Sequence, residues 1–338
     1  MTDYFRPLVQ IGPARPDAAV PLAGGWGWFT HAEVLSRSAS PRVVPATDIP
    51  ASVLARLTAA RTEIASLSLD RPRIMGILNT TPDSFSDGGQ HTAVSDAVRA
   101  GQAMVAAGAD ILDIGGESTR PGADFVPVSE EITRTLPVIA ALRGAGLRTP
   151  ISIDTRKSAV AEAAVRAGAN LVNDVSGFTF DPALGPLCQT LGLPVCVMHA
   201  QGDPATMHLD PRYDNVLLDV YDALERQIAV LEASGIPRSA ILADPGIGFG
   251  KTQEHNLALL ARLSLFHALG TPILLGVSRK RFIGTIGNAP QAQDRAPGSI
   301  AVALAGLGQG VQMIRVHDVD DTRQAVALWH AAYFGSIL

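Results

Sequence analysis

Eight short apolar runs in this chain each lead into a polar or ionisable residue that is capable of chemistry. The residues at these ends are Asn79, Asp113, Asp154, Asn173, His199, Asp244, Ser278-Arg279-Lys280 and Arg315-Val316-His317. At a single position, a residue that caps a loop would be the simpler explanation. Eight such positions in one repeating pattern predict a common site instead.

One part of this predicted site is rich in carboxylates. Asp154, Asn173 and Asp244 offer two carboxylates and an amide. A carboxylate accepts two adjacent N–H groups in one plane, so these side chains suit a heterocycle of the aminopyrimidinone kind.

The other part of the predicted site is cationic. It contains Ser278, Arg279, Lys280, Arg315 and His317. Ser278 is predicted to cap a helix that begins at Arg279, where free backbone N–H groups favour anions. The site is therefore predicted to have a heterocycle end and an anion end.

The elements that position these residues repeat along the chain. The apolar runs are Ile74–Asn79, Ile111–Asp113, Ile151–Asp154, Leu171–Asp174, Val195–His199, Ile241–Asp244, Ile273–Ser278 and Met313–His317. Continuous Val/Ile/Leu runs are typical of strands buried on both faces. Helical segments between them, such as Ser95–Ala107 and Ser158–Ala167, indicate right-handed crossovers. We expect a (β/α)8 TIM barrel, with the polar residues at the carboxyl ends of its strands; a doubly wound open sheet is the alternative.

Two loops rich in Gly, Pro, Ser and Asp follow the first two strands. They are Thr80–Gly89 and Gly115–Gly122, and their composition predicts mobile segments that close over a reaction. Three other patterns fail as motifs. Gly250-Lys251-Thr252 lacks the first glycine of a phosphate-binding loop, and Gly276–Lys280 lacks the second glycine of a nucleophile elbow. His199 has no partners at zinc-ligand spacing.

The same segments carry a family resemblance. Met75–Gly89 resembles the first signature of the dihydropteroate synthases, and Asp113–Gly122 resembles the second. Further matches in order and spacing lie at Ser152–Thr155, Asn173-Asp174, Asp244–Lys251, Ser278–Lys280 and Arg315–Asp318. The resemblance covers about residues 72 to 335.

This resemblance implies roles for individual residues. It implies that Asn79 binds the Mg²⁺ that accompanies a pyrophosphate, and that Asp113 lies in the pterin region. It assigns pterin binding to Asp154, Asn173, Asp244 and Lys280, and diphosphate binding to Thr119, Arg120, Arg315 and His317. Phe249, together with Lys280, is expected near p-aminobenzoate. One departure is Arg281, which stands where the family often has a serine that holds the aminobenzoate carboxylate.

The implied reaction joins a pterin pyrophosphate to p-aminobenzoate. We expect a dissociative step in which pyrophosphate leaves and Asp113 and Asp154 stabilise a pterin methylene cation, because no activated Ser or Cys is apparent. Lys280, Arg315 and His317 complete the predicted catalytic set. Two alternatives are a pterin-dependent methyltransferase, which would need no diphosphate site, and a non-catalytic pterin-binding or structural barrel.

Composition sets the remaining expectations. The chain has 338 residues, 47% hydrophobic, and a net charge of −5, which suits a large buried core and argues against a nucleic-acid-binding face. No apolar run approaches a membrane span and no signal peptide is apparent, so we expect a cytoplasmic enzyme. Cys188 and Cys196 are expected to be core residues. Residues 1–70 are predicted to be an accessory segment of unknown function, with a helix at Ala51–Ser66, and residues 71–338 the catalytic domain. A homodimer is implied by the family alone.

Overall fold

Eight parallel strands form the centre of the molecule. The computed structural model describes residues 3–80, 90–118, 124–202, 207 and 209–337. Its largest sheet has the strand order β11-β10-β9-β8-β7-β6-β13-β12. The two end strands meet through a parallel bridge between Ala243 and Ile273, where the Ala243 backbone N–H donates to Pro272 O at 2.9 Å. The sheet therefore closes into the predicted (β/α)8 barrel, and the open doubly wound sheet is excluded.

The barrel strands agree with the eight predicted runs. Their bounds are β6 (Arg73–Asn79), β7 (Ile111–Gly115), β8 (Ile151–Asp154), β9 (Leu171–Asp174), β10 (Val195–Met198), β11 (Ile241–Asp244), β12 (Leu274–Gly276) and β13 (Met313–Val316). The largest difference is at β12, which stops two residues before Ser278. There the chain turns, since the Lys280 N–H donates to Val277 O at 3.2 Å and Arg279 has a φ of 59°.

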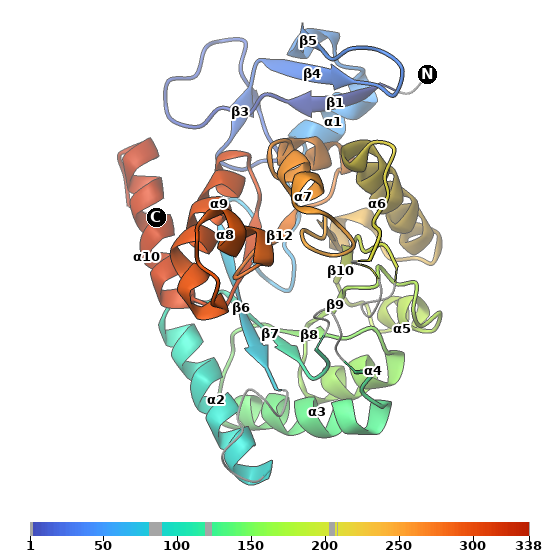
Figure 1. The fold of residues 1–338 in the computed structure, drawn as a ribbon, viewed down its shortest axis with the longest axis vertical. Coiled ribbons are helices and arrows are strands. Elements are labelled where there is room, and N and C mark those ends of the chain that lie inside the picture. Colours follow the sequence, from blue (N-terminus) through green and yellow to red (C-terminus); the bar gives the residue numbers. More distant parts are fainter. Residues whose placement is uncertain (1–2, 81–89, 119–123, 203–206, 208, 338) are drawn as a thin grey trace.

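Helices surround the barrel and cover its strands (Figure 1). They are α2 (Gln90–Ala106), α3 (Val128–Gly144), α4 (Ser158–Ala167), α5 (Leu184–Thr190), α6 (Val216–Ala233), α7 (Gln253–Leu260), α8 (Arg281–Ile286), α9 (Ala296–Gly308) and α10 (Val319–Phe334). Short 3₁₀ helices are η1 (Ala46–Asp48), η3 (Arg238–Ala240), η4 (Leu263–Leu269) and η5 (Ala292–Arg295). The predicted helix Ser158–Ala167 is confirmed, and Gly168 ends it with a φ of 116°. Among the described residues, no helix has the length and apolar character that crossing a bilayer requires.

The first 58 residues contain structure that the sequence analysis did not predict. Strands β1 (Tyr4–Pro7), β4 (His31–Leu35) and β5 (Arg42–Pro45) form a three-stranded antiparallel sheet, and β2 (Val20–Pro21) pairs with β3 (Trp28–Phe29). Figure 1 shows this sheet at one end of the molecule, next to α1 (Ala51–Thr58) and beyond α6 and α7. Period-two alternation is weak in such short strands, so the sequence predicted an accessory segment with one helix and none of these strands.

The predicted helix Ala51–Ser66 is wrong in its second half, because α1 ends at Thr58. Beyond that helix, Ile64 and Leu67 form an antiparallel bridge, with Ala65 and Ser66 at positive φ between them. This tight turn brings Ile64 and Leu69, both buried, beneath the barrel. Tertiary packing has overridden the helical spacing of the local sequence.

Ile64 and Leu69 close the amino-terminal end of the barrel, which we call the base. They form one apolar cluster with the first residues of the strands, namely Met75, Ile111, Leu171, Cys196, Leu242, Leu274 and Met313. All nine side chains are at most 2% exposed. The opposite, carboxyl-terminal end, which we call the mouth, receives the polar residues. Cys188 and Cys196 are both buried and free, as predicted.

Candidate active site at the barrel mouth

Arg315 on β13 links two carboxylates across the mouth. Its Nε donates to Asp113 Oδ2 at 2.5 Å, and its Nη2 donates to Asp154 Oδ2 at 2.7 Å. Asp113 comes from β7 and Asp154 from β8, and the three residues meet because β13 pairs with β6, which alone separates it from β7 in the sheet. Sequence analysis placed Arg315 at the anion end and the two aspartates at the heterocycle end. In the structure, the three residues are in direct contact.

Asp113 has an unused acceptor. Its side chain is fully buried, and Asn173 Nδ2 also donates to its Oδ2, at 3.1 Å. Its Oδ1 atom is buried and has no hydrogen-bond partner among the described residues. An unpaired buried carboxylate oxygen costs free energy unless a ligand satisfies it. Burial also raises the pKa of the neighbouring Asp154 to about 8, with Asp113 adding to the increase against the opposing charge of Arg315. The pair therefore suits a ligand that brings N–H donors.

Asp244 and Lys280 lie on the other side of the mouth. Asp244 ends β11, and its Oδ1 accepts the Gly246 backbone N–H at 2.7 Å. Burial raises the pKa of Asp244 to about 6 and lowers that of Lys280 to about 8. The Lys280 Nζ atom lies 4.0 Å from the centre of the Phe249 ring, a cation–π contact. The structure thus brings together the predicted pair of Phe249 and Lys280.

One prediction for the anion end is wrong. Ser278 does not cap a helix at Arg279, because α8 begins at Arg281 after Lys280. Its Oγ instead accepts the His317 backbone N–H at 3.1 Å and lies 2.9 Å from His317 Nδ1. Arg279 Nε donates to Asp318 at 3.0 Å, so a carboxylate offsets its charge. The other side chains of the predicted anion end are Lys280, Arg315 and His317.

Part of the predicted site cannot be placed. Thr119, Arg120 and residues 81–89 of the first loop lie outside the described residues. Asn79 ends β6, is half-buried, and pairs in register with Gly115. Among the described residues, no three His, Cys, Asp or Glu side chains form a group able to hold a metal ion. One amide oxygen nevertheless suits Mg²⁺, which keeps several waters and takes its other ligands from substrate phosphates.

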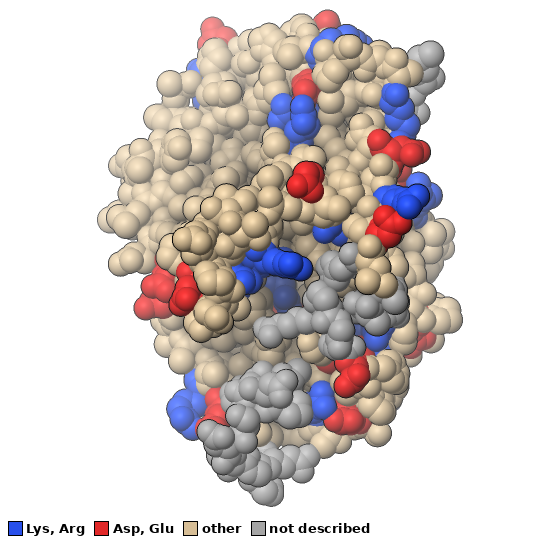
Figure 2. All heavy atoms as spheres, in the orientation of Figure 1, with Lys and Arg blue, Asp and Glu red and all other residues tan. Residues whose placement is uncertain are grey.

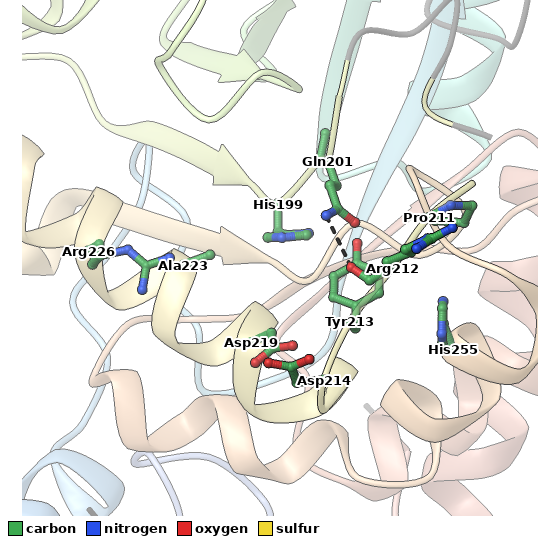
Figure 3. A pocket seen from close by; sticks show the side chains of 11 residues that line it. His199, Gln201, Pro211, Arg212, Tyr213, Asp214, Asp219, Ala223, Arg226 and His255 are labelled. Carbon is green, nitrogen blue, oxygen red and sulfur yellow. Dashed lines mark hydrogen bonds between the residues drawn. The ribbon is translucent and has the colours of Figure 1, made fainter. Parts of the chain in front are cut away.

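The face of the molecule drawn in Figure 2 has a hollow with basic side chains, and a separate cavity is drawn in Figure 3. Figure 2 shows Lys and Arg side chains gathered at a hollow in the middle of this face. A separate cavity of about 750 Å³ lies between the β10 exit, α6 and α7, lined by His199, Gln201, Tyr213, Arg226 and His255 among others (Figure 3). Of the residues predicted at strand ends, only His199 contributes to this cavity.

The sequence analysis did not single out a buried ionic cluster beside the mouth. Lys157 Nζ donates to Glu131 at 2.6 Å and to Val126 O at 2.7 Å, and it lies 3.1 Å from Glu117. Arg156 Nε donates to Glu117 at 3.0 Å. The cluster ties the chain after β7 to the chain after β8. A sequence signal existed, because lysine is rare in this chain and Lys157 lies three residues after the predicted strand end Asp154.

The family of pterin-binding enzymes matches residues 75–317, which include the closed barrel and the carboxylates and cations at its mouth, so the chain belongs to that family. Within this family, the chain belongs to the dihydropteroate synthases, which are transferases. It is 46% identical over 266 residues to the dihydropteroate synthase of Escherichia coli (strain K12), covering 79% of this chain and 93% of that relative.

Solved structures agree with this assignment. The Xanthomonas albilineans dihydropteroate synthase with 4-aminobenzoic acid superposes with a TM-score of 0.76 and 46% identity, covering 80% of this chain and 97% of that one. The same enzyme in complex with 7,8-dihydropteroate gives a TM-score of 0.72 and 43% identity, covering 79% and 95%.

Proposed function

We propose that this enzyme condenses 6-hydroxymethyl-7,8-dihydropterin pyrophosphate with p-aminobenzoate to give 7,8-dihydropteroate and pyrophosphate. The observation that carries the proposal is Arg315 held between Asp113 and Asp154, at the same mouth as Lys280 and Phe249. These groups offer acceptors for a pterin and cations for a leaving pyrophosphate. The complexes of related enzymes with 4-aminobenzoic acid and 7,8-dihydropteroate support both substrates. Residues 71–338 form the proposed catalytic domain.

Asp113, Asp154, Asn173 and Asp244 are proposed to hold the pterin. The free Oδ1 of Asp113 and the carboxylate of Asp244 accept pterin N–H groups, while the Asn173 amide can both give and accept hydrogen bonds. Arg315 is proposed to have two roles. It neutralises the carboxylates and it contacts the diphosphate. Lys280 holds the pterin edge with its ammonium.

Pyrophosphate departure is proposed to precede bond formation. The bond between the methylene carbon and the pyrophosphate oxygen breaks, and the electron pair leaves with pyrophosphate. Asp113 and Asp154 stabilise the resulting pterin cation, while Arg315, His317, Thr119 and Arg120 stabilise the leaving group. The arylamine nitrogen forms the new C–N bond and releases a proton. The p-aminobenzoate ring is proposed to lie near Phe249 and Lys280, with Arg281 close to its carboxylate.

A Mg²⁺ ion is proposed to accompany the pyrophosphate at Asn79. When bound, it would offset negative charge on the leaving group. The Asn79 amide oxygen at the end of β6 is the protein ligand that this role requires. We also place the enzyme in the cytoplasm, with small-molecule substrates and no nucleic-acid or membrane partner.

The enzyme is proposed to act as a homodimer. Helix α10 and the residues after it present apolar side chains to solvent, including Leu328 at 66% exposure and Ile337 beyond the helix end at 91%. Exposed apolar patches of this kind are typical of protein interfaces. Sedimentation of the wild type and of a Leu328→Asp variant tests the assignment: a dimer and a monomer are expected, respectively.

The test of function is pyrophosphate release by the purified chain given the pterin pyrophosphate, with and without p-aminobenzoate and Mg²⁺. Release that depends on Mg²⁺, yields dihydropteroate and is lost in Arg315→Ala supports the proposal. Absence of release with pterin binding retained would favour the methyltransferase or non-catalytic alternatives. Exchange of pyrophosphate oxygens in the absence of amine supports the dissociative order.

A further inference from the structure

Lysine occurs at only three positions in this chain, and all three are close to the mouth. Lys157, Lys251 and Lys280 are the lysines among 27 lysine and arginine residues. They follow β8, β11 and β12, respectively. Lys157 and Lys251 are 3% and 5% exposed. Most cations of the chain are therefore arginines, and the few lysines lie near the predicted site.

Lys251 lies inside the loop that precedes it. Its Nζ donates to Gly246 O at 2.9 Å, to Phe249 O at 3.0 Å and to His199 O at 3.3 Å, and it lies 2.9 Å from His199 Nδ1. Burial lowers the pKa of His199 to about 3, so its neutral ring can accept at Nδ1. An ammonium has three donors on one atom, whereas a guanidinium is a planar fork. The loop therefore wraps around hydrogen-bond donors on a single nitrogen atom, a shape that a guanidinium does not reproduce. Burial lowers the pKa of Lys251 to about 7.

The outer side of this loop is in close contact with other segments of the chain. Gly246 has a φ of 65°, and a Cβ there would lie 1.9 Å from His199 O. Gly248 N–H donates to Asn256 Oδ1 at 2.7 Å, and Tyr213 Oη donates to Gly250 O at 2.8 Å. Figure 3 shows His199 and Tyr213 in the wall of the neighbouring cavity. The loop is thus fixed by Lys251 inside and by side chains of other elements outside.

This loop presents two groups of the proposed site. Gly246 N–H donates to Asp244 Oδ1, which sets the orientation of that carboxylate. Phe249, whose carbonyl oxygen accepts from Lys251, places its ring against the ammonium of Lys280. We infer that Lys251 is a positioning residue, which holds Asp244 and Phe249 in the geometry that binds the pterin and the arylamine. The inference rests on the proposed function and assigns Lys251 no contact with substrate.

Substitution of Lys251 in the full chain tests the inference. Lys251→Met removes the donors at similar volume, and Lys251→Arg keeps the charge but changes its shape. Tyr213→Phe removes a single outer hydrogen bond and is the mild variant, should the others fail to fold. Leu69→Ala, at the base, is the control for lost stability without a change at the mouth. For each protein we would measure the Kd of the pterin pyrophosphate, the KM for p-aminobenzoate, kcat and the unfolding midpoint.

Both Lys251 variants are expected to raise the pterin Kd and the aminobenzoate KM about tenfold, with kcat changed less than about threefold. Tyr213→Phe should shift both constants about threefold in the same direction. Leu69→Ala should lower the unfolding midpoint while both constants stay within about twofold of wild type. Wild-type constants in Lys251→Met, or equal shifts in Leu69→Ala, would overturn the inference. Lack of turnover in the wild type would instead refute the proposed function, and the comparison of pterin Kd values would still decide the role of Lys251.

Discussion

The base and the mouth of the barrel are formed by the same eight strands but differ in the kind of side chain that they bury. At the base, nine apolar side chains from the strands and from the segment around Ile64 and Leu69 pack together. At the mouth, buried carboxylates and cations meet within hydrogen-bonding distance, as Arg315 does with Asp113 and Asp154. The base contributes apolar burial, while the mouth holds charges that are costly to remove from water.

This difference shows how stability and chemistry are divided along a strand. Ile111 of β7 is buried in the base, and Asp113, two residues later, is buried in the mouth. An unpaired acceptor such as Asp113 Oδ1 is tolerated because the rest of the barrel stabilises the fold. We therefore expect substitutions at the mouth to change activity, and substitutions at the base to change the free energy of unfolding.

The largest effect is expected for Asp113→Asn. Loss of this charge leaves Arg315 with one carboxylate and turns an N–H group toward the pterin donors. We expect kcat/KM for pyrophosphate release to fall by about 10³-fold. Asp318→Asn is the matched control, because Asp318 pairs with Arg279 outside the proposed site, and kcat/KM should change less than about threefold. Full activity in Asp113→Asn would remove Asp113 from the mechanism.

Leu69→Ala should lower the stability of the protein through the base of the barrel and leave activity at the mouth unchanged. Leu69 is 2% exposed, and its truncation should lower the free energy of unfolding by about 2 to 5 kcal/mol. Urea unfolding monitored by circular dichroism measures this change. At temperatures below the unfolding transition, kcat/KM should match the wild type. A loss of activity without a loss of stability would contradict the division between the two ends.

The pH dependence of activity should sharpen the description of the mouth. In the proposed mechanism Asp244, with its pKa raised to about 6, and Asp154, with its pKa raised to about 8, must both be ionised, so kcat/KM should rise with pH through about 6 and on to about 8. Lys280, with its pKa lowered to about 8, must be protonated, so kcat/KM should fall above about 8. Lys280→Arg should remove the alkaline decline while lowering the maximum. An unchanged decline in that variant would assign it to another group.

The smallest effect is expected between the amino-terminal sheet and α6. Arg37 pairs with Asp219 at 2.7 Å and with Asp222 at 2.8 Å, but its side chain is 42% exposed. Exposed pairs contribute about 0 to 1 kcal/mol, so Arg37→Ala should change the free energy of unfolding by less than about 1 kcal/mol, with unchanged activity. A larger loss of stability would show that the Arg37 ion pairs hold the whole amino-terminal sheet against α6. High salt, which screens these pairs, would then lower the free energy of unfolding of the wild type by a similar amount.

The sequence predicted the barrel well because its strands are buried on both faces. Each apolar run from Ile74 onward matches a strand to within two residues, and the helix Ser158–Ala167 is present with the predicted bounds. The site residues Asp113, Asp154 and Arg315 were found for the same reason, since strand ends must meet at one rim. The predicted domain boundary near residue 70 stays a prediction.

The errors share a different physical origin. Ser278 and Arg279 were assigned from local spacing, but their partners His317 and Asp318 lie about 39 residues away. The end of α1 depends on the base of the barrel, which removes Ile64 from the helix. Lys251 seemed only a failed phosphate-binding motif, because nothing local shows that four acceptors surround its ammonium. Contacts between distant segments decide these positions, and a single sequence does not display them.

The scarcity of lysine has a practical consequence for chemical labelling. Reagents that acylate primary amines usually mark many surface lysines of a protein. Here Lys157 and Lys251 are enclosed, and only Lys280 is partly exposed, in the hollow where the pterin is proposed to bind. An activated ester added to the folded enzyme would therefore act as a probe of site occupancy rather than of the surface. Bound ligand would shield the one lysine within its reach, and mass spectrometry would read out that protection residue by residue.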